Sequence, residues 1–392
     1  MRTPINLPGL TAKVIYPASI FSLERHENIP YERFAYNVFR EAISALGEKN
    51  LPLEFVVEFP FSTVSYPAWE VNCSVLAEKH SSGSLNKVIV QPPELLPTIL
   101  FIFSACIGQH LFSDTGRDLC VKDPSLLNGY IQHFFDTASQ LVSIYRTQGM
   151  ASAIRTTYES IGVDFNAAKE SFDYFDSLSF LIANHEVAHI YVSQLSLKFD
   201  NSKENSKAIE IIADLIASEW FFRRYVYFTP DMESYRESRK FTSHAEAVLA
   251  NSKWAIETQL ALLLLMGVSG AQGAGGRFHF EGGMCYPGSF GRYWLQQAWL
   301  FSAIEGELHE ILPEEYRKHL TVIWKEYFNI LCSSGVLSKR ALQQVMDSDD
   351  VKIISQVADL VEANKIEELK PGIELLRSRE KAAEVMRSQI KI

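Results

Sequence analysis

The stretch "NHEVAHIYVSQL", Asn184 to Leu195, places two histidines four residues apart and a glutamate directly after the first of them. Residues at helical spacing form one stripe through this part of the chain: Leu178, Leu181, Ile182, His185, Ala188, His189, Val192 and Leu195. The pattern predicts an amphipathic helix between Asp176 and Leu197, with Asp176 or Ser177 as its N-cap. Because positions i and i+4 lie on one face of a helix, the two imidazoles are expected to converge on a single ion.

Glu186 is rotated by about 100° from His185 on such a helix, so its carboxylate comes beside an ion that the histidines hold. This is the HExxH pattern, in which two histidines bind zinc and the glutamate takes a proton from the zinc-bound water. The alternative is an ordinary helix whose histidines face solvent or a core that satisfies their hydrogen bonds.

A second helix supplies carboxylates that complete the predicted site. The polar run "KFDNSKENSK" interrupts the apolar pattern, and a helix is expected to begin near Ala208, which makes a helical hairpin with the first helix. In "EIIAD", Glu210 to Asp214, the first carboxylate is the candidate third ligand of a catalytic zinc, whose fourth position stays open. Asp214 lies one turn further along, where it is expected to accept a hydrogen bond from a ligand histidine.

The order HExxH and then, about twenty residues later, ExxAD resembles the gluzincin group of metallopeptidases. The likeness is to HtpX-type and prenyl-protein peptidases and to phage-exclusion Lit-type peptidases. Those families commonly carry a third element, a His-Pro followed after four residues by Arg. Here "YPGSFGR" has Pro287 and Arg292 in register, with Tyr286 in the place of the histidine.

The resemblance implies roles for two residues of this third element. Tyr286 would donate a hydrogen bond to the developing oxyanion, and Arg292 would hold the substrate or the transition state. The alternative is a proline-glycine turn followed by an ordinary surface arginine. His279, in the same glycine-rich stretch, is another candidate donor.

The resemblance covers roughly Ser177 to Arg292 and implies a zincin-like core that cleaves a protein or peptide substrate. Its membrane-embedded members have spanning helices. Two apolar runs of this chain, "LLPTILFIFSACIG" and "LALLLLMGVSGA", are shorter than the roughly 20 residues that a span needs, so both are expected to be buried helices. The likeness therefore shifts towards the Lit-type enzymes, which implies a defence or toxin-like peptidase acting on one host protein.

Composition is that of an ordered globular protein of 392 residues, with 47% hydrophobic and 21% charged residues. The formal charge of -10 argues against a nucleic-acid partner, since phosphate recognition needs a basic surface. Five scattered cysteines without a CxxC pair argue against a disulfide framework or a cysteine zinc site. The start "MRTPINLPGL" lacks the apolar core of a signal peptide, so a cytoplasmic setting is expected.

The fold class predicted from these patterns is α+β and predominantly helical. Short strands are expected in "LPLEFVVEFPFSTVSYPAWEVNCSVLAEK" and "NKVIVQPP", and helices dominate from about Asn128 onward. Three regions follow: residues 1–150 as a mixed α/β part, 151–300 as the helical metallopeptidase core, and 301–392 as a C-terminal helical part. A glycine-dense loop is expected between Gly267 and Gly291.

Together these observations predict a zinc endopeptidase in which His185, His189 and Glu210 bind Zn²⁺ and Glu186 activates water. One alternative is a regulatory or interaction protein that keeps a metal-bound helical hairpin for stability, without turnover. A second alternative is a zinc hydrolase that acts on a bond other than a peptide.

Overall fold

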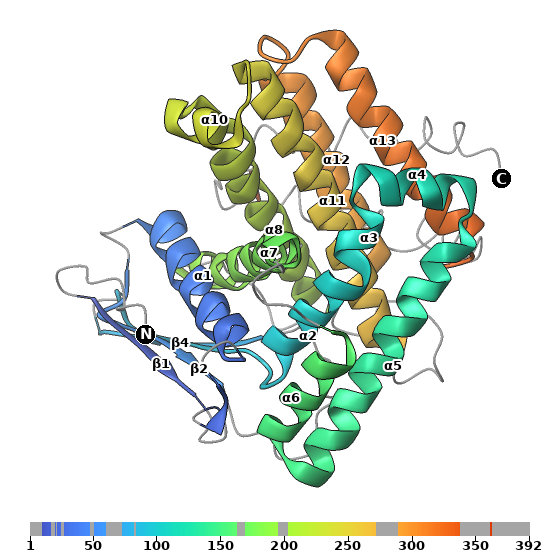
Figure 1. Ribbon diagram of the computed structural model, residues 1–392. Coiled ribbons are helices and arrows are strands. Elements are labelled where there is room, and N and C mark those ends of the chain that lie inside the picture. The colour runs from blue at the N-terminus through green and yellow to red at the C-terminus, as the bar shows by residue number, and fades with distance from the viewer. Residues whose placement is uncertain are drawn as a thin grey trace. The chain divides into compact units, whose positions relative to one another are not determined.

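The protein is described by a computed structural model over residues 10–16, 20, 22–24, 27–47, 51–59, 73–81, 84–162, 169–194, 203–271, 289–337 and 361–362. Helices predominate in this part of the chain, and its strands form one small mixed sheet near the N-terminus (Figure 1). The predicted class, α+β and mainly helical with short strands in the first third, is therefore confirmed.

The chain divides into two compact units. The first comprises Met1–Ile190 with Leu265–His279, and the second comprises Tyr191–Leu264 with Phe280–Ile392. Their bounds differ from those of the regions 1–150, 151–300 and 301–392, and that three-region division stays a prediction.

The sheet of the first unit has the strand order β1-β2-β4-β3. Three strands are parallel: β1 (Thr11–Ile15), β2 (Glu54–Glu58) and β4 (Leu85–Gln91). The remaining strand, β3 (Ser74–Lys79), pairs antiparallel with β4 and forms an edge of the sheet. Strands β2 and β3 lie within the first predicted strand segment, β4 begins one residue before the second, and β1 is an addition to them.

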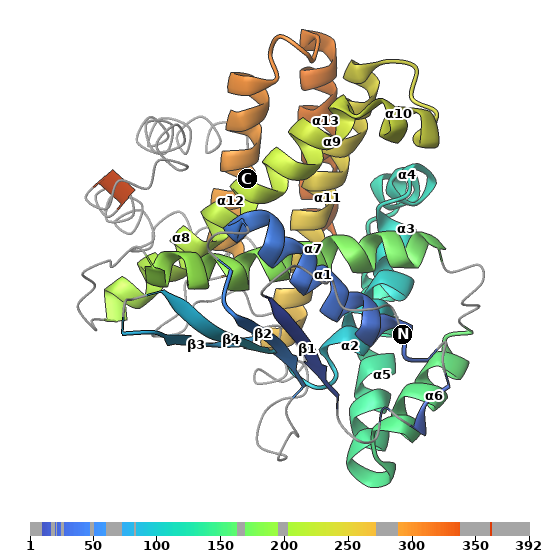
Figure 2. The ribbon, with the colours of Figure 1, turned by 90° about the vertical axis from the view of Figure 1, so that its left-hand side faces the viewer.

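One face of the sheet is covered by helix α1 (Ile29–Leu46). Pro30 lies in its first turn, where a missing N–H costs nothing, and Gly47 ends the helix with a φ of 69°. The rings of Phe39 and Phe55 lie 5.5 Å apart, which packs the helix on β2. Figure 2 shows α1 and α7 on the same side of the strands.

The other helices of the first unit follow the sheet in the chain. They are α2 (Leu96–Phe103), the π-helical turn η3 (Ser104–Gly108), α3 (Gln109–Leu111), α4 (Asp114–Lys122), α5 (Ser125–Gln148) and α6 (Met150–Ser160). Every residue of α2 is buried, as expected for the first apolar run. Among the described residues no single helix has the length and apolar character of a membrane span, although Leu96–Leu111 and Asp114–Lys122 meet both criteria as a pair bent by 70°.

Helix α7 (Lys169–Gln194) carries the HExxH residues and is longer than predicted. The predicted N-cap is wrong, because Asp176 and Ser177 lie inside the helix. The Asp176 carboxylate instead accepts hydrogen bonds from Arg33 and Asn37 of α1. Burial on α7 also extends beyond the predicted apolar stripe, because four residues outside the stripe are buried: Asn184, Glu186, Val187 and Ile190. A helix buried nearly all round is an internal element of the core.

The second unit is helical throughout its described part. It contains α8 (Lys203–Phe221), the π-helical turn η4 (Phe222–Phe228), α9 (Thr229–Asp231), α10 (Glu233–Arg239), most of α11 (His244–Ala271), α12 (Ser289–Glu307) and α13 (Glu314–Ser333). Helix α8 begins at Lys203, five residues before the predicted start at Ala208. Of the predicted loop between Gly267 and Gly291, the first residues belong to α11 and the last to α12, and the rest lies outside the described residues.

Helices α8 and α12 pack closely in the second unit, and two pairs of side chains join them. Arg292 binds Asp214, and Trp299 Nε1 donates to Glu219 at 2.9 Å. A third pair joins Arg223 of η4 to Glu307 of α12. Since the residue numbers rise together along both helices, α8 and α12 run in the same direction. This packing holds the ExxAD segment of α8.

Candidate metal centre

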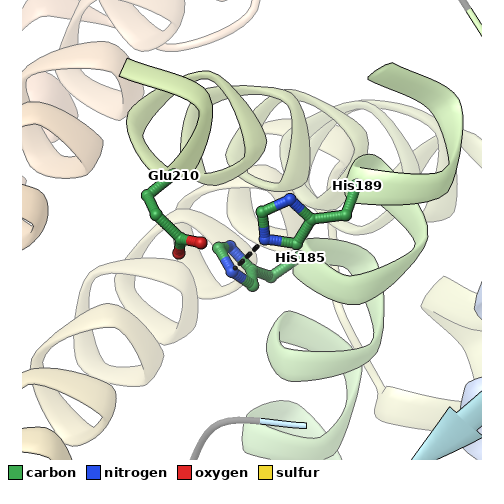
Figure 3. Close-up of side chains that lie close together, drawn as sticks. All are labelled: His185, His189 and Glu210. Carbon is green, nitrogen blue, oxygen red and sulfur yellow. Dashed lines mark hydrogen bonds between the residues drawn. The ribbon is translucent and has the colours of Figure 1, made fainter. Parts of the chain in front are cut away.

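The two histidines of α7 point at one another. Their Nε2 atoms lie 3.0 Å apart, with the rings at 88° and their centroids separated by 4.6 Å (Figure 3). Two ring nitrogens at this distance need a shared proton or a shared cation, because two lone pairs facing each other repel. The spacing of one helical turn therefore brings His185 and His189 together as predicted.

Glu210 of α8 joins the pair. One ligand atom from each of His185, His189 and Glu210 lies within 4.8 Å of the other two, and all three residues are half-buried. Figure 3 shows the carboxylate directed towards the imidazoles. The three residues could hold a metal ion.

The distances and donor types suit a small divalent cation. Tetrahedral zinc with bonds of about 2.0–2.1 Å to nitrogen needs ligand nitrogens about 3.3–3.4 Å apart. The histidine nitrogens are within a few tenths of an ångström of that separation, which a small side-chain rotation corrects. Two imidazoles and a carboxylate also form a known ligand set of catalytic zinc.

The exposure of α7 singles out the same residues. Between Ser177 and Val192 every residue is buried except His185, His189 and Tyr191, which are half-buried. The two histidines and Tyr191 are thus the partly accessible residues of an otherwise internal segment. The alternative of an ordinary helix whose histidines face solvent or a satisfied core stays open beside the metal site.

Glu186 lies beside this group, at the edge of the sheet. Its side chain is buried, and Oε1 accepts a hydrogen bond from the main-chain N–H of Cys73 at 3.3 Å. Cys73 directly precedes β3. Burial, and next the charge of Glu186, raise the pKa of the Cys73 thiol well above its ordinary value, so the thiol stays protonated at neutral pH.

Asp214 and Arg292 form an ion pair near Glu210. Arg292 donates from Nε to Oδ2 of Asp214 at 2.5 Å and from Nη2 to Oδ1 at 2.8 Å, and Nη2 lies 3.8 Å from Oε2 of Glu210. Arg292 is 7% exposed, so the alternative of a surface arginine is wrong. The hydrogen bond from a ligand histidine to Asp214 and the contact of Arg292 with substrate stay predictions. Tyr286, Pro287 and His279 lie outside the described residues.

Contacts between α1 and α7 fix the helix that bears the histidines, and sequence reasoning missed them. Asn184, next to His185, donates from Nδ2 to Oε2 of Glu41 at 3.0 Å, and both residues are buried. Two turns earlier, Arg33 and Asn37 bind Asp176. No local pattern pairs residues about 140 positions apart in the chain, so only the fold reveals these bonds.

The Cys73 contact with Glu186 was missed for a related reason. Its donor is a main-chain N–H, which every residue type except proline carries, so no sequence signal distinguishes it. Within the described residues, His185, His189 and Glu210 are the one group of three metal-ligating side chains at these distances. Comparisons of the chain with protein-family models, with curated proteins and with solved structures give no match.

Proposed function

We propose that this protein is a zinc-dependent endopeptidase of gluzincin type with a zincin-like core. One observation carries the proposal: His185 and His189 of α7 and Glu210 of α8 bring three ligand atoms within 4.8 Å of one another. These residues would hold Zn²⁺. Three protein ligands leave a fourth position for water or substrate, as in catalytic rather than structural zinc sites.

Bound zinc would polarise the scissile carbonyl and lower the pKa of its water. Glu186, one residue after the first ligand, takes the proton from this water and passes it to the leaving nitrogen. Arg292, held by Asp214, lies close enough to Glu210 to fix the position of that carboxylate. Roles for Arg292 in holding substrate and for Tyr286 in stabilising the oxyanion are part of the proposal.

The position of β3 supports a peptide as the substrate. Among the described strands β3 has one neighbour, β4, and most of its residues are exposed, so an extended peptide would bind by pairing with the other edge of β3. Cys73, directly before β3, donates its N–H to Glu186. A peptide added to this edge would therefore lie next to the proposed general base.

The biological setting is proposed from the resemblance to Lit-type enzymes. It would be cleavage of one host protein in the cytoplasm, in a defence or toxin-like role. Cleavage of many unrelated proteins in a whole-proteome digest would argue against a single target.

The test compares the purified wild-type protein with Glu186→Gln in a mass-spectrometric screen for cleaved cellular proteins. Glu186→Gln keeps the ligands, so it is expected to retain wild-type zinc content while cleavage falls by about 10²–10⁴-fold, the usual contribution of a general base. Glu237→Gln, on the exposed side of α10, is the matched control and is expected to cleave normally. Full activity in Glu186→Gln, or cleavage that survives removal of zinc, would reject the proposal.

A further inference from the structure

We infer that the main-chain N–H of Cys73 positions the carboxylate of Glu186, and that Cys73 is thus a positioning residue of the site. The inference rests on the proposed function, since it concerns the proposed general base. It assigns the role to the backbone of Cys73 and not to its thiol.

The contact joins parts of the chain that are 113 residues apart. Glu186 Oε1 lies 3.3 Å from the Cys73 nitrogen, and the glutamate is 5% exposed. A buried carboxylate needs donors in place of water, and bonds to charged acceptors are the stronger class of hydrogen bond. The N–H of Cys73 therefore restricts the directions in which the carboxylate can point.

The register of β3 explains why this N–H is available. Ser74, the first residue of β3, lies opposite Gln91 of β4. Main-chain groups of successive residues alternate between the two sides of a strand. Since the N–H of Cys73 bonds to Glu186, it takes no part in the ladder with β4. A substitution that removes this N–H thus leaves the pairing of β3 with β4 unchanged.

Two substitutions at one position separate the backbone from the thiol. Cys73→Ala removes the sulfur and keeps the N–H, whereas Cys73→Pro removes the N–H, and proline is accepted just before an edge strand. Both variants leave His185, His189 and Glu210 unchanged. Only Cys73→Pro should remove the hydrogen bond from residue 73 to the Glu186 carboxylate.

The first measurement is structural and needs no substrate. Labelling with ¹⁵N-cysteine gives amide signals from the five cysteines, and Cys73→Ala identifies the signal of residue 73. In Glu186→Ala this amide proton is expected to move upfield while the other four stay, because a hydrogen bond to a carboxylate is lost. Glu237→Ala should move none of them. The inference is overturned if the chemical shift of the Cys73 amide is the same in Glu186→Ala as in the wild type.

The second measurement is kinetic, on a peptide substrate found in the cleavage screen. A misplaced catalytic group costs up to about 100-fold, so Cys73→Pro is expected to lower kcat by about 10- to 100-fold with KM within about threefold. Cys73→Ala should stay within about twofold of wild type. Equal kcat values for correctly folded Cys73→Pro and Cys73→Ala overturn the inference.

The outcomes distinguish this inference from the proposed function. If Cys73→Pro does not fold, the amide signal decides alone. If the wild-type protein shows no zinc-dependent cleavage, both the proposed function and a kinetic role for Cys73 are rejected. A Glu186-dependent amide shift would then support only the contact itself.

Discussion

Arg292 and Asp214 form a buried, bidentate ion pair between α12 and α8, with donor–acceptor distances of 2.5 and 2.8 Å. The pair lies one helical turn from Glu210, and Arg292 Nη2 is 3.8 Å from a Glu210 oxygen. Glu210 is therefore oriented by a guanidinium that a second carboxylate holds in place. The position of one candidate metal ligand depends on the packing of two helices.

Removal of one partner of this pair is expected to destabilise the protein. Asp214→Ala leaves the Arg292 charge buried without its main partner, which costs about 3–5 kcal/mol in the free energy of unfolding. Urea denaturation measures this loss, and Arg292→Ala in a double-mutant cycle separates the pair energy from packing. Arg317→Ala, which breaks a more exposed pair with Glu305, is the control and should cost less than about 1 kcal/mol. Equal costs for the two positions would contradict the assigned role.

Metal binding gives a second prediction. Wild-type protein is expected to bind one Zn²⁺ per chain, while His185→Ala leaves two of the three ligands and loses most of the affinity. Plasma emission spectroscopy after dialysis measures the stoichiometry. Zinc that binds only the folded state also raises the free energy of unfolding, by about 2.7 kcal/mol at 100 times the dissociation constant.

The control for metal binding is His309→Ala, a change at an exposed histidine. It should bind zinc as the wild type does. The three residues are not a metal centre if His185→Ala binds as much zinc as the wild type. The same conclusion follows if added zinc does not raise the midpoint of thermal unfolding of the wild-type protein.

Some of this structure follows from local sequence patterns. The i, i+4 spacing of His185 and His189 predicts their convergence because helix geometry alone determines it. The strands β2 to β4 are predicted because Val- and Phe-rich runs bounded by turn residues are local signals.

Features set by tertiary contacts could not be predicted in the same way. Asp176 has the residue type of an N-cap, but its carboxylate binds Arg33 and Asn37 of α1, so the helix continues through it. Glu186 and Cys73 meet because an edge strand lies beside α7, and Arg292 is buried because α12 packs on α8. Each of these depends on which elements become neighbours, which no window of sequence contains.

The bond between Asn184 and Glu41 gives a third prediction. Asn184→Ala removes a donor from a buried carboxylate, which costs about 1–3 kcal/mol in the free energy of unfolding. Chemical denaturation measures the loss. Gln132→Ala is the control, because the hydrogen bond from Gln132 to Asp136 is exposed on α5 and its loss should cost under about 0.5 kcal/mol. No difference between the two variants would mean that the bond does not hold α7.

Buried tyrosines predict how the protein responds to alkali. Burial raises the pKa values of Tyr31, Tyr158 and Tyr293 above their ordinary value near 10. Above about pH 10 the unfolded chain therefore loses phenolic protons that the folded protein keeps. The free energy of unfolding is expected to be independent of these groups below that pH and to fall above it, by up to about 1.4 kcal/mol per pH unit for each tyrosine.

Tyr31→Phe tests this behaviour at one residue. The Tyr31 hydroxyl donates to the main-chain oxygen of Glu94 at 3.1 Å and lies 2.9 Å from Oγ1 of Thr98, so its loss costs about 0.5–1.5 kcal/mol at neutral pH. Above pH 10 the variant should lose stability less steeply than the wild type, because one phenol no longer ionises on unfolding. If the stability of Tyr31→Phe falls as steeply as that of the wild type above pH 10, ionisation of Tyr31 on unfolding does not contribute to the alkaline transition.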